Sequence, residues 1–168
     1  MAGLTTDLID ILNTAADSLN DLVELSKEKT GVIVANDMPE LQKITELEQI
    51  LTARYQKLDR SREELMQDMA SVLNIKSDNV TLTVLADAIK EQEEAPALLA
   101  VMERLTTIAA ALKEVNESNR ALIDYSLDYL EFSLNVIRTS QTNGPTLLTP
   151  TGEEISSSSQ GGIFDAIQ

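Results

Sequence analysis

Carboxylates are the side chains of this protein with the most obvious capacity for chemistry. The 168 residues include 28 Asp and Glu against 13 Lys and Arg, which gives a formal net charge of −15. Acid pairs occur at helical spacing in this chain, such as Glu24 with Glu28. The di-metal sites of helical bundles, however, need a Glu-x-x-His pair on inward faces. The chain has no histidine. We therefore predict that the acids form a solvated face and hold no metal.

The other catalytic arrangements are incomplete as well. There is no cysteine, hence no thiolate and no disulfide, and a serine nucleophile would lack its histidine base. The Gly161-Gly162 pair follows no predicted strand and opens no predicted helix, so it does not form a phosphate loop. We predict a protein that is not an enzyme and needs no cofactor.

Charge and hydropathy restrict the partners and the location. A chain with this net charge is repelled by nucleic acid and by anionic lipid surfaces. No apolar run approaches the roughly 20 residues that span a bilayer, and the N-terminus lacks the basic region and apolar core of a signal peptide. We therefore expect a cytoplasmic protein, with neither nucleic-acid binding nor membrane insertion.

Composition and periodicity predict an all-α protein. Aromatic residues make up only 3% of the chain, and it has only six Gly and four Pro. This composition suits long helices better than a sheet. Two helices, over about residues 5–35 and 38–72, should form a long antiparallel hairpin, with Asp37 capping the second and Glu40 completing a capping box. The first has the 4-3 spacing of a coiled-coil seam at Leu8, Leu12, Ala15, Leu19, Leu22, Ser26, Lys29 and Ile33. The second has 3-4 spacing at Leu41, Ile44, Glu48, Leu51, Tyr55, Leu58, Arg62, Leu65, Met69 and Val72.

Polar residues interrupt both seams. Such residues can fix the register of helices. We favour the other interpretation, that they lie where the seam is open to water, because the stems of long charged side chains pack while their ends reach solvent. The residues concerned are Ser26, Lys29, Glu48 and Arg62.

A short helix and a third long helix follow the hairpin. Thr81 is predicted to cap the short one, and Pro96 to begin the long one, over about residues 97–138. A single helix over 81–138 is the alternative, which Pro96 disfavours because the residue before a proline avoids helical dihedrals. We predict that the first half of the long helix packs along the hairpin. Asn116 and Asn119 interrupt its stripe, either as a polar layer that fixes alignment or as caps of buried amides.

The last part of this helix is apolar on most of its sides, which exceeds what a small bundle can cover. One line, formed by Leu122, Tyr129 and Val136, continues the inner stripe, so we assign it to the hairpin. The other line should bind a partner. The predicted partner-binding residues are Ile123, Tyr125, Leu127, Leu130, Phe132, Leu134 and Ile137. The competing hypothesis is a structural coiled-coil adaptor that homodimerises through the same side chains.

The periodic pattern stops near Thr139. We therefore divide the chain into a helical domain, residues 1–140, and a flexible acidic tail, residues 141–168, rich in Ser, Gly and Pro. The tail ends in an apolar cluster, with Ile163, Phe164 and Ile167 as a possible docking motif. A frayed end without function is the alternative.

Four segments together resemble the FlgN family of flagellar export chaperones. They are residues 22–29, a leucine-rich stretch followed by Lys-x-Lys; residues 36–48, with the pattern N-D-x-x-x-L-x-x-I-x-x-x-E; residues 116–123, with the pattern N-x-x-N-x-x-L-I; and a tail glycine followed by Phe164-Asp165-Ala166. None is specific alone. Their order and spacing, over most of the chain, carry the resemblance.

The resemblance implies a cytosolic helical chaperone without catalytic activity. Members bind the C-terminal helical ends of the hook–filament junction (hook-associated) proteins through their own C-terminal helical region. They keep these clients unassembled and deliver them to the flagellar type III export apparatus. In some members a tail tyrosine contacts the export gate; Leu148 stands at that position here, so we do not transfer this contact. We also consider a homodimer possible when the client is absent.

Overall fold

The computed structural model of the protein describes residues 2–76 and 80–142, which form four helices and no strand. The helices are α1 (Ala2–Ala35), α2 (Met38–Leu73), α3 (Leu82–Ala88) and α4 (Ala95–Thr142). The all-α prediction is thus confirmed. Contacts divide the chain into two units, residues 1–125 and 126–168. The predicted tail lies outside the described residues, apart from its first two, which continue α4.

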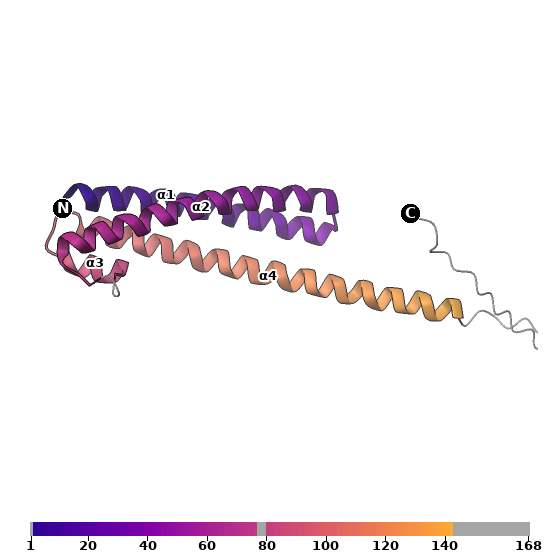
Figure 1. The fold of residues 1–168 in the computed structure, drawn as a ribbon. Helices are drawn as coiled ribbons and strands as arrows, with labels where there is room; N and C mark the ends of the chain where they lie inside the picture. The colour runs from indigo at the N-terminus through magenta and orange to yellow at the C-terminus, as the bar shows by residue number, and fades with distance from the viewer. Residues whose placement is uncertain (1, 77–79, 143–168) are drawn as a thin grey trace, which may run out of the picture. The chain divides into compact units, whose positions relative to one another are not determined.

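The helices α1 and α2 form the predicted antiparallel hairpin (Figure 1). Asn36 ends α1 with a φ of 55°, a left-handed conformation that Asn tolerates better than most residues. Its N–H donates to the carbonyl of Ile33 (3.1 Å), and the N–H of Asp37 donates to that of Val32 (3.2 Å). These two bonds form a Schellman motif. Asn74, also at φ 55°, ends α2 in the same way.

Asp37 caps α2 as predicted, because its carboxylate accepts a hydrogen bond from the N–H of Glu40 at 3.1 Å. The reciprocal half of the capping box is absent. The N–H of Asp37 is already used by Val32, and the carboxylate of Glu40 pairs instead with Lys43 at 2.7 Å. That hydrogen bond, with the attraction of the same carboxylate, raises the pKa of Lys43.

The seam of the hairpin follows the sequence pattern closely in α1. Seven of its eight predicted positions are buried: Leu8, Leu12, Ala15, Leu19, Leu22, Ser26 and Ile33. In α2, Ile44 and Met69 are buried and most other predicted positions are half-buried, while Val72 is exposed. The 3-4 spacing therefore identified the packed face of both helices, and α1 is the more deeply covered.

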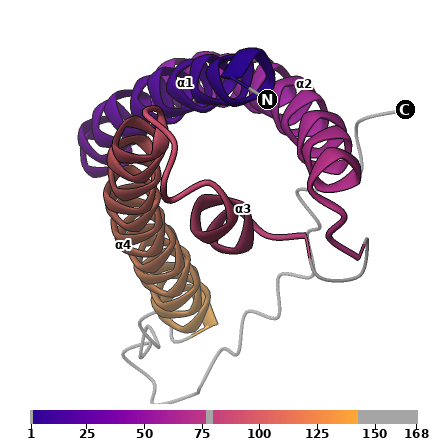
Figure 2. The ribbon, with the colours of Figure 1, turned by 90° about the vertical axis from the view of Figure 1, so that its left-hand side faces the viewer.

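The main apolar core lies where the hairpin's open end meets α3 and the start of α4. Figure 2 shows α3 on the inner side of the arc formed by the neighbouring helices. The buried members of this core are Leu8, Leu12, Met66, Met69, Leu85, Ala86, Ile89, Ala95, Leu98 and Val101. Thr81 caps α3 as predicted, accepting from the N–H of Val84 at 3.2 Å. The helix ends at Ala88, so the alternative of one continuous helix over 81–138 is wrong.

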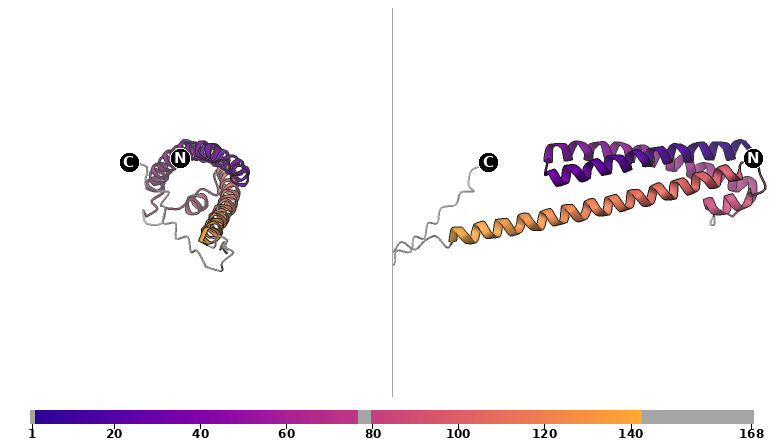
Figure 3. Two further views of the ribbon diagram at one scale, coloured as in Figure 1. Left: turned by 90° about the vertical axis from the view of Figure 1, so that its right-hand side faces the viewer. Right: turned by 180° about the vertical axis from the view of Figure 1, so that it is seen from behind.

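The first half of α4 packs along the hairpin, as predicted. Figure 3 shows its beginning beside α1 and α3. Leu98 and Val101 enter the core, and Arg104 forms an ion pair with Asp17 of α1 and a hydrogen bond with Asn13. The contact between α4 and α1 thus begins with apolar packing and continues through polar groups.

Candidate partner-binding surface

The second half of α4 carries most of the exposed large apolar side chains among the described residues. Tyr125 is 72% exposed, and five further predicted partner-binding residues are more than half exposed: Leu127, Leu130, Phe132, Leu134 and Ile137. Exposed apolar surface of this kind is typical of a protein–protein contact. Side chains on a helix recur every three or four residues, so this surface can take up the apolar stripe of another helix.

Two of the sequence assignments on α4 need correction. Tyr129 is 62% exposed and Val136 is 50% exposed, although the sequence pattern assigned both to the hairpin side. Leu122 and Ile123 are half-buried. The last buried residue of α4 is Asn119, so the inner stripe ends there and does not continue to Tyr129. The exposed surface is therefore wider than the sequence predicted and includes both apolar lines.

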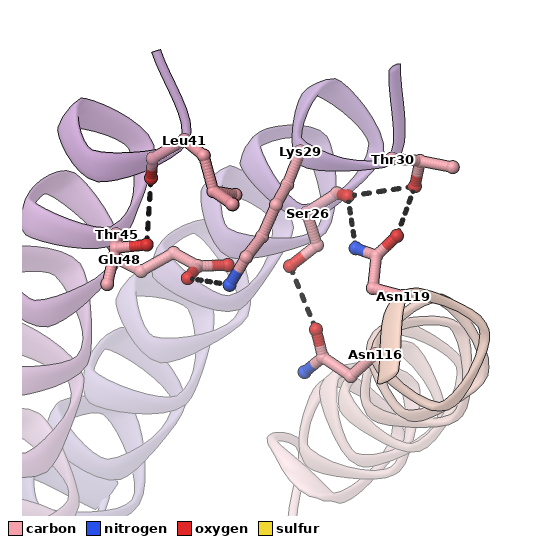
Figure 4. A network of polar contacts seen from close by, with 8 residues as sticks. All are labelled: Ser26, Lys29, Thr30, Leu41, Thr45, Glu48, Asn116 and Asn119. Atoms are coloured by element: carbon pink, nitrogen blue, oxygen red, sulfur yellow. Dashed lines mark hydrogen bonds and ion pairs between the residues drawn. The ribbon is translucent and has the colours of Figure 1, made fainter. Parts of the chain in front are cut away.

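A polar layer joins α1 and α4 just before this surface begins (Figure 4). Asn119 is 4% exposed; its amide N–H donates to the main-chain carbonyl of Ser26 at 2.7 Å, and its amide oxygen accepts from the Thr30 hydroxyl at 2.6 Å. The Ser26 hydroxyl donates to the amide oxygen of Asn116 at 3.1 Å. Both alternatives for these asparagines apply in part, because the two side chains form a polar layer and Asn119 also binds a main-chain amide group of α1. Sequence reasoning missed Thr30, whose signal was its position one turn after Ser26.

An ion pair lies beside the polar layer, within the α1–α2 seam. The Lys29 ammonium group and the Glu48 carboxylate are 2.6 Å apart, and each side chain is only 19% exposed. Ser26 is 1% exposed. The expectation that these seam residues lie open to water is therefore wrong for Ser26, whereas Lys29 and Glu48 meet it only in part because both are half-buried. Arg62 pairs with Asp59 of its own helix at 2.8 Å and is half-buried, closer to that expectation.

The polar layer and the ion pair together line a cleft between α1, α2 and α4. The cleft has a volume of about 410 Å³, and Leu22, Leu112 and Ile123 supply its apolar wall. Ile123 is the one predicted partner-binding residue that reaches this cleft. The others lie on the exposed surface of α4 and do not line it.

Apart from Glu48, most carboxylates of the described residues lie on the solvated faces of the helices. Glu24 pairs with Lys27 at 2.8 Å, and both side chains are more than half exposed. Over residues 2–76 and 80–142, no group of three acidic side chains converges as a metal site would require. For the described residues, this arrangement supports salt bridges and solvation.

The length and composition of α4 raise the question of whether this helix could span a membrane. Residues 95–140 form a helix long and apolar enough to cross a bilayer by those two criteria. This corrects the expectation that no segment approaches such a length. It is weak support for a membrane span, since helices of soluble proteins meet the same criteria.

The tail residues Leu148, Ile163, Phe164 and Ile167 lie outside the described residues.

Comparison with known protein families gives a match over most of the chain. A family model described as FlgN protein matches residues 1–154, a range that includes all four helices and the whole exposed surface of α4. No curated protein and no solved structure matches the chain.

Proposed function

Because this chain belongs to the FlgN family, we propose that it is a cytoplasmic chaperone for the hook–filament junction proteins. The family is one of flagellar export chaperones that bind flagellar proteins, and it is not a family of enzymes. To this family role we add the identity of the client and the delivery of that client for export. The protein binds the terminal helices of the junction subunits, keeps them unassembled, and delivers them to the export apparatus.

The observation that carries the proposal is the exposed apolar surface of α4, from Tyr125 to Ile137. Terminal helices of junction subunits are amphipathic and pair with one another in the assembled filament. A free helix of this kind associates wrongly unless its apolar stripe is covered. The α4 surface can cover it by helix-to-helix packing, and the strongly acidic remainder of the chain keeps the complex soluble.

The charges within α4 favour this use over a membrane span. Glu103 and Arg104 interrupt its first half, and Asp124, Asp128 and Glu131 alternate with the apolar residues of its second half. Each acid at the centre of a membrane helix costs about 2.5–3.5 kcal/mol, whereas an acid at the margin of a helix–helix contact remains solvated. We therefore place the protein in the cytoplasm.

The domain division is also a proposal. We assign residues 1–140 to the chaperone domain and residues 141–168 to an acidic tail whose Ile163, Phe164 and Ile167 act as a docking motif. A chain ending at Thr142, where α4 ends, should keep both its free energy of unfolding and its client affinity. Loss of either would place the boundary elsewhere.

The test of the proposed function is binding of purified junction subunits by isothermal titration calorimetry. Leu127→Asp with Leu134→Asp places two charges in the desolvated contact. An unpaired buried charge costs several kcal/mol, so affinity should fall by at least about 100-fold. Leu99→Asp is the matched control, because Leu99 lies on the same helix and is 56% exposed against 58% for Leu127. It should leave affinity unchanged.

Three outcomes contradict the proposal. If the double variant unfolds, this surface belongs to the core. If it folds and binds the subunits normally, the client site lies elsewhere. If the free protein is a permanent dimer that the double substitution dissociates, and it binds no junction subunit, the protein is the structural adaptor. Light scattering on the free protein separates this last case from the first two.

A further inference from the structure

A second apolar groove lies on the hairpin, lined by α1 and α2 alone. Leu25 of α1 and Leu47, Ile50 and Leu51 of α2 form its floor, and its volume is about 270 Å³. Leu47 is 50% exposed and Ile50 is 65% exposed. Neither residue belongs to the 3-4 seam of α2. No residue of α4 lines the groove, so it is separate from the proposed client surface.

One wall of this groove is acidic. Asp21, Glu24 and Glu28 line it from α1, at spacings of three and four residues that place them on one helix face. Glu24 pairs with the exposed Lys27, and within the described part of the chain no ion pair is found for Asp21 or Glu28. The groove thus combines an apolar floor with a row of carboxylates along one side.

These features indicate which kind of ligand the groove can bind. The lining consists of helix side chains and offers no unpaired backbone edge, so a helix fits better than an extended strand. Two antiparallel helices with exposed apolar residues between them can accept a third at the usual interaxial distance of about 8–10 Å. The acidic wall repels a negatively charged partner and attracts a positive one.

We propose that this groove docks a basic amphipathic helix of a protein partner other than the export client. Its apolar residues contact the floor formed by Leu25, Leu47, Ile50 and Leu51, and its Lys or Arg residues face the acidic wall. Asp21 and Glu28 are seven positions apart, about 10 Å of helix, so about two turns of the partner span the acidic wall. The inference does not depend on the client, since α4 takes no part.

The probe is a synthetic helical peptide of about 18 residues, with Leu at i, i+3, i+4 and i+7 spacing and Lys along one flank. A counterpart carries Glu in place of each Lys. Titration of the full chain, followed by fluorescence anisotropy and amide chemical shifts, should show binding of the basic peptide alone. The shifts should map to residues 21–28 and 47–51. Affinity should fall as salt is raised, because exposed charges are screened.

Two sets of substitutions test the two halves of the groove. Leu47→Ser with Ile50→Ser should weaken peptide binding by about tenfold or more, as loss of central apolar contacts does. Asp21→Asn, Glu24→Gln and Glu28→Gln together should do the same and retain the helical packing. The matched control is Glu63→Gln, Glu64→Gln and Asp68→Asn, which removes the same charge from exposed acids of α2. It should change affinity by less than about twofold.

Each contrary result overturns the proposal. Equal weakening by the control triple would show general charge attraction. Equal binding of the acidic peptide would remove the role of the wall. Loss of peptide binding on Leu127→Asp with Leu134→Asp would place the peptide on α4. Self-association of the free chain that Leu47→Ser with Ile50→Ser abolishes would make a second copy the occupant. If that pair lowers the thermal stability, the charge-neutral triple decides alone.

Discussion

Asn119 of α4 holds the main-chain carbonyl of Ser26 in α1 through an amide N–H···O bond of 2.7 Å. Its other amide atom accepts from Thr30 at 2.6 Å, so one buried side chain is bound to two successive turns of α1. A buried polar group that is satisfied only in one alignment penalises the others. This pair therefore fixes the register of α4 on the hairpin, immediately before the exposed surface.

Replacement of Asn119 tests this role. In Asn119→Ala the Thr30 hydroxyl loses one acceptor and the Ser26 carbonyl loses a donor, and the free energy of unfolding should fall by about 1–3 kcal/mol. Urea denaturation followed by circular dichroism measures the change. Ser118→Ala, at the preceding exposed position, is the control and should be within about 0.5 kcal/mol of the wild type. A stability loss equal to that of the control would show that the layer contributes nothing.

A second substitution separates charge from hydrogen bonding at the same site. In Asn119→Asp the side chain can still accept from Thr30 but, when ionised, can no longer donate to the Ser26 carbonyl. Burial disfavours the ionised carboxylate and raises its pKa in the folded protein. The variant should therefore lose stability as pH rises from 4 to 7, relative to wild type. Parallel pH profiles for the two proteins would contradict this.

The ion pair between Lys29 and Glu48 gives a third prediction. Each side chain is 19% exposed, so removal of one partner leaves a poorly solvated charge. Lys29→Met should lower the free energy of unfolding by about 1–2 kcal/mol, less than for a fully buried pair. The double variant Lys29→Met with Glu48→Leu should recover most of the loss, because apolar side chains of similar volume can replace such a pair. Urea titrations of the three variants give the coupling energy. Additive effects would show that the pair does not interact.

The helices and their packed faces could be predicted from the sequence, whereas the role of the seam's polar residues could not. Spacing identifies which residues of α1 share a face, and that face is buried from Leu8 to Ile33. Spacing alone does not tell which group lies opposite Ser26 or Lys29. Those partners, Asn116 and Glu48, belong to other helices, and only the alignment of the helices brings them together.

The candidate surface on α4 shows a different limit. Tyr129 and Val136 continue the period of the inner stripe, so periodicity assigned them to the hairpin. The spacing of apolar residues predicts which of them share a helix face. Burial also requires a neighbouring helix along that stretch, and the last buried residue of the stripe is Asn119. The predicted residues Tyr125, Leu127 and Phe132 are exposed, and their role as a client site remains a prediction.

Adjacent leucines at the start of α4 test the core. Leu98 is fully buried and Leu99 is 56% exposed, although both lie in the same turn. Leu98→Ala should cost about 2–5 kcal/mol of unfolding free energy through lost contacts and a cavity. Leu99→Ala should remain within about 0.5 kcal/mol of the wild type. Urea denaturation measures both. Equal effects would show that α4 does not pack here as described.

The apolar length of α4 gives the last prediction. If the helix were a membrane span, the purified protein would associate with lipid whatever the headgroup. We expect the full chain to remain unbound in flotation assays, both with neutral phosphatidylcholine vesicles and with vesicles containing anionic lipid. In neutral vesicles Glu103 and Arg104 oppose insertion of the first half of α4, and Asp124, Asp128 and Glu131 oppose insertion of the second, since each charged group costs several kcal/mol at the bilayer centre. In anionic vesicles the net charge of −15 adds repulsion. Flotation with the neutral vesicles would contradict this prediction. If Leu127→Asp with Leu134→Asp abolished that flotation and Leu99→Asp left it unchanged, the exposed surface of α4 would be what binds lipid.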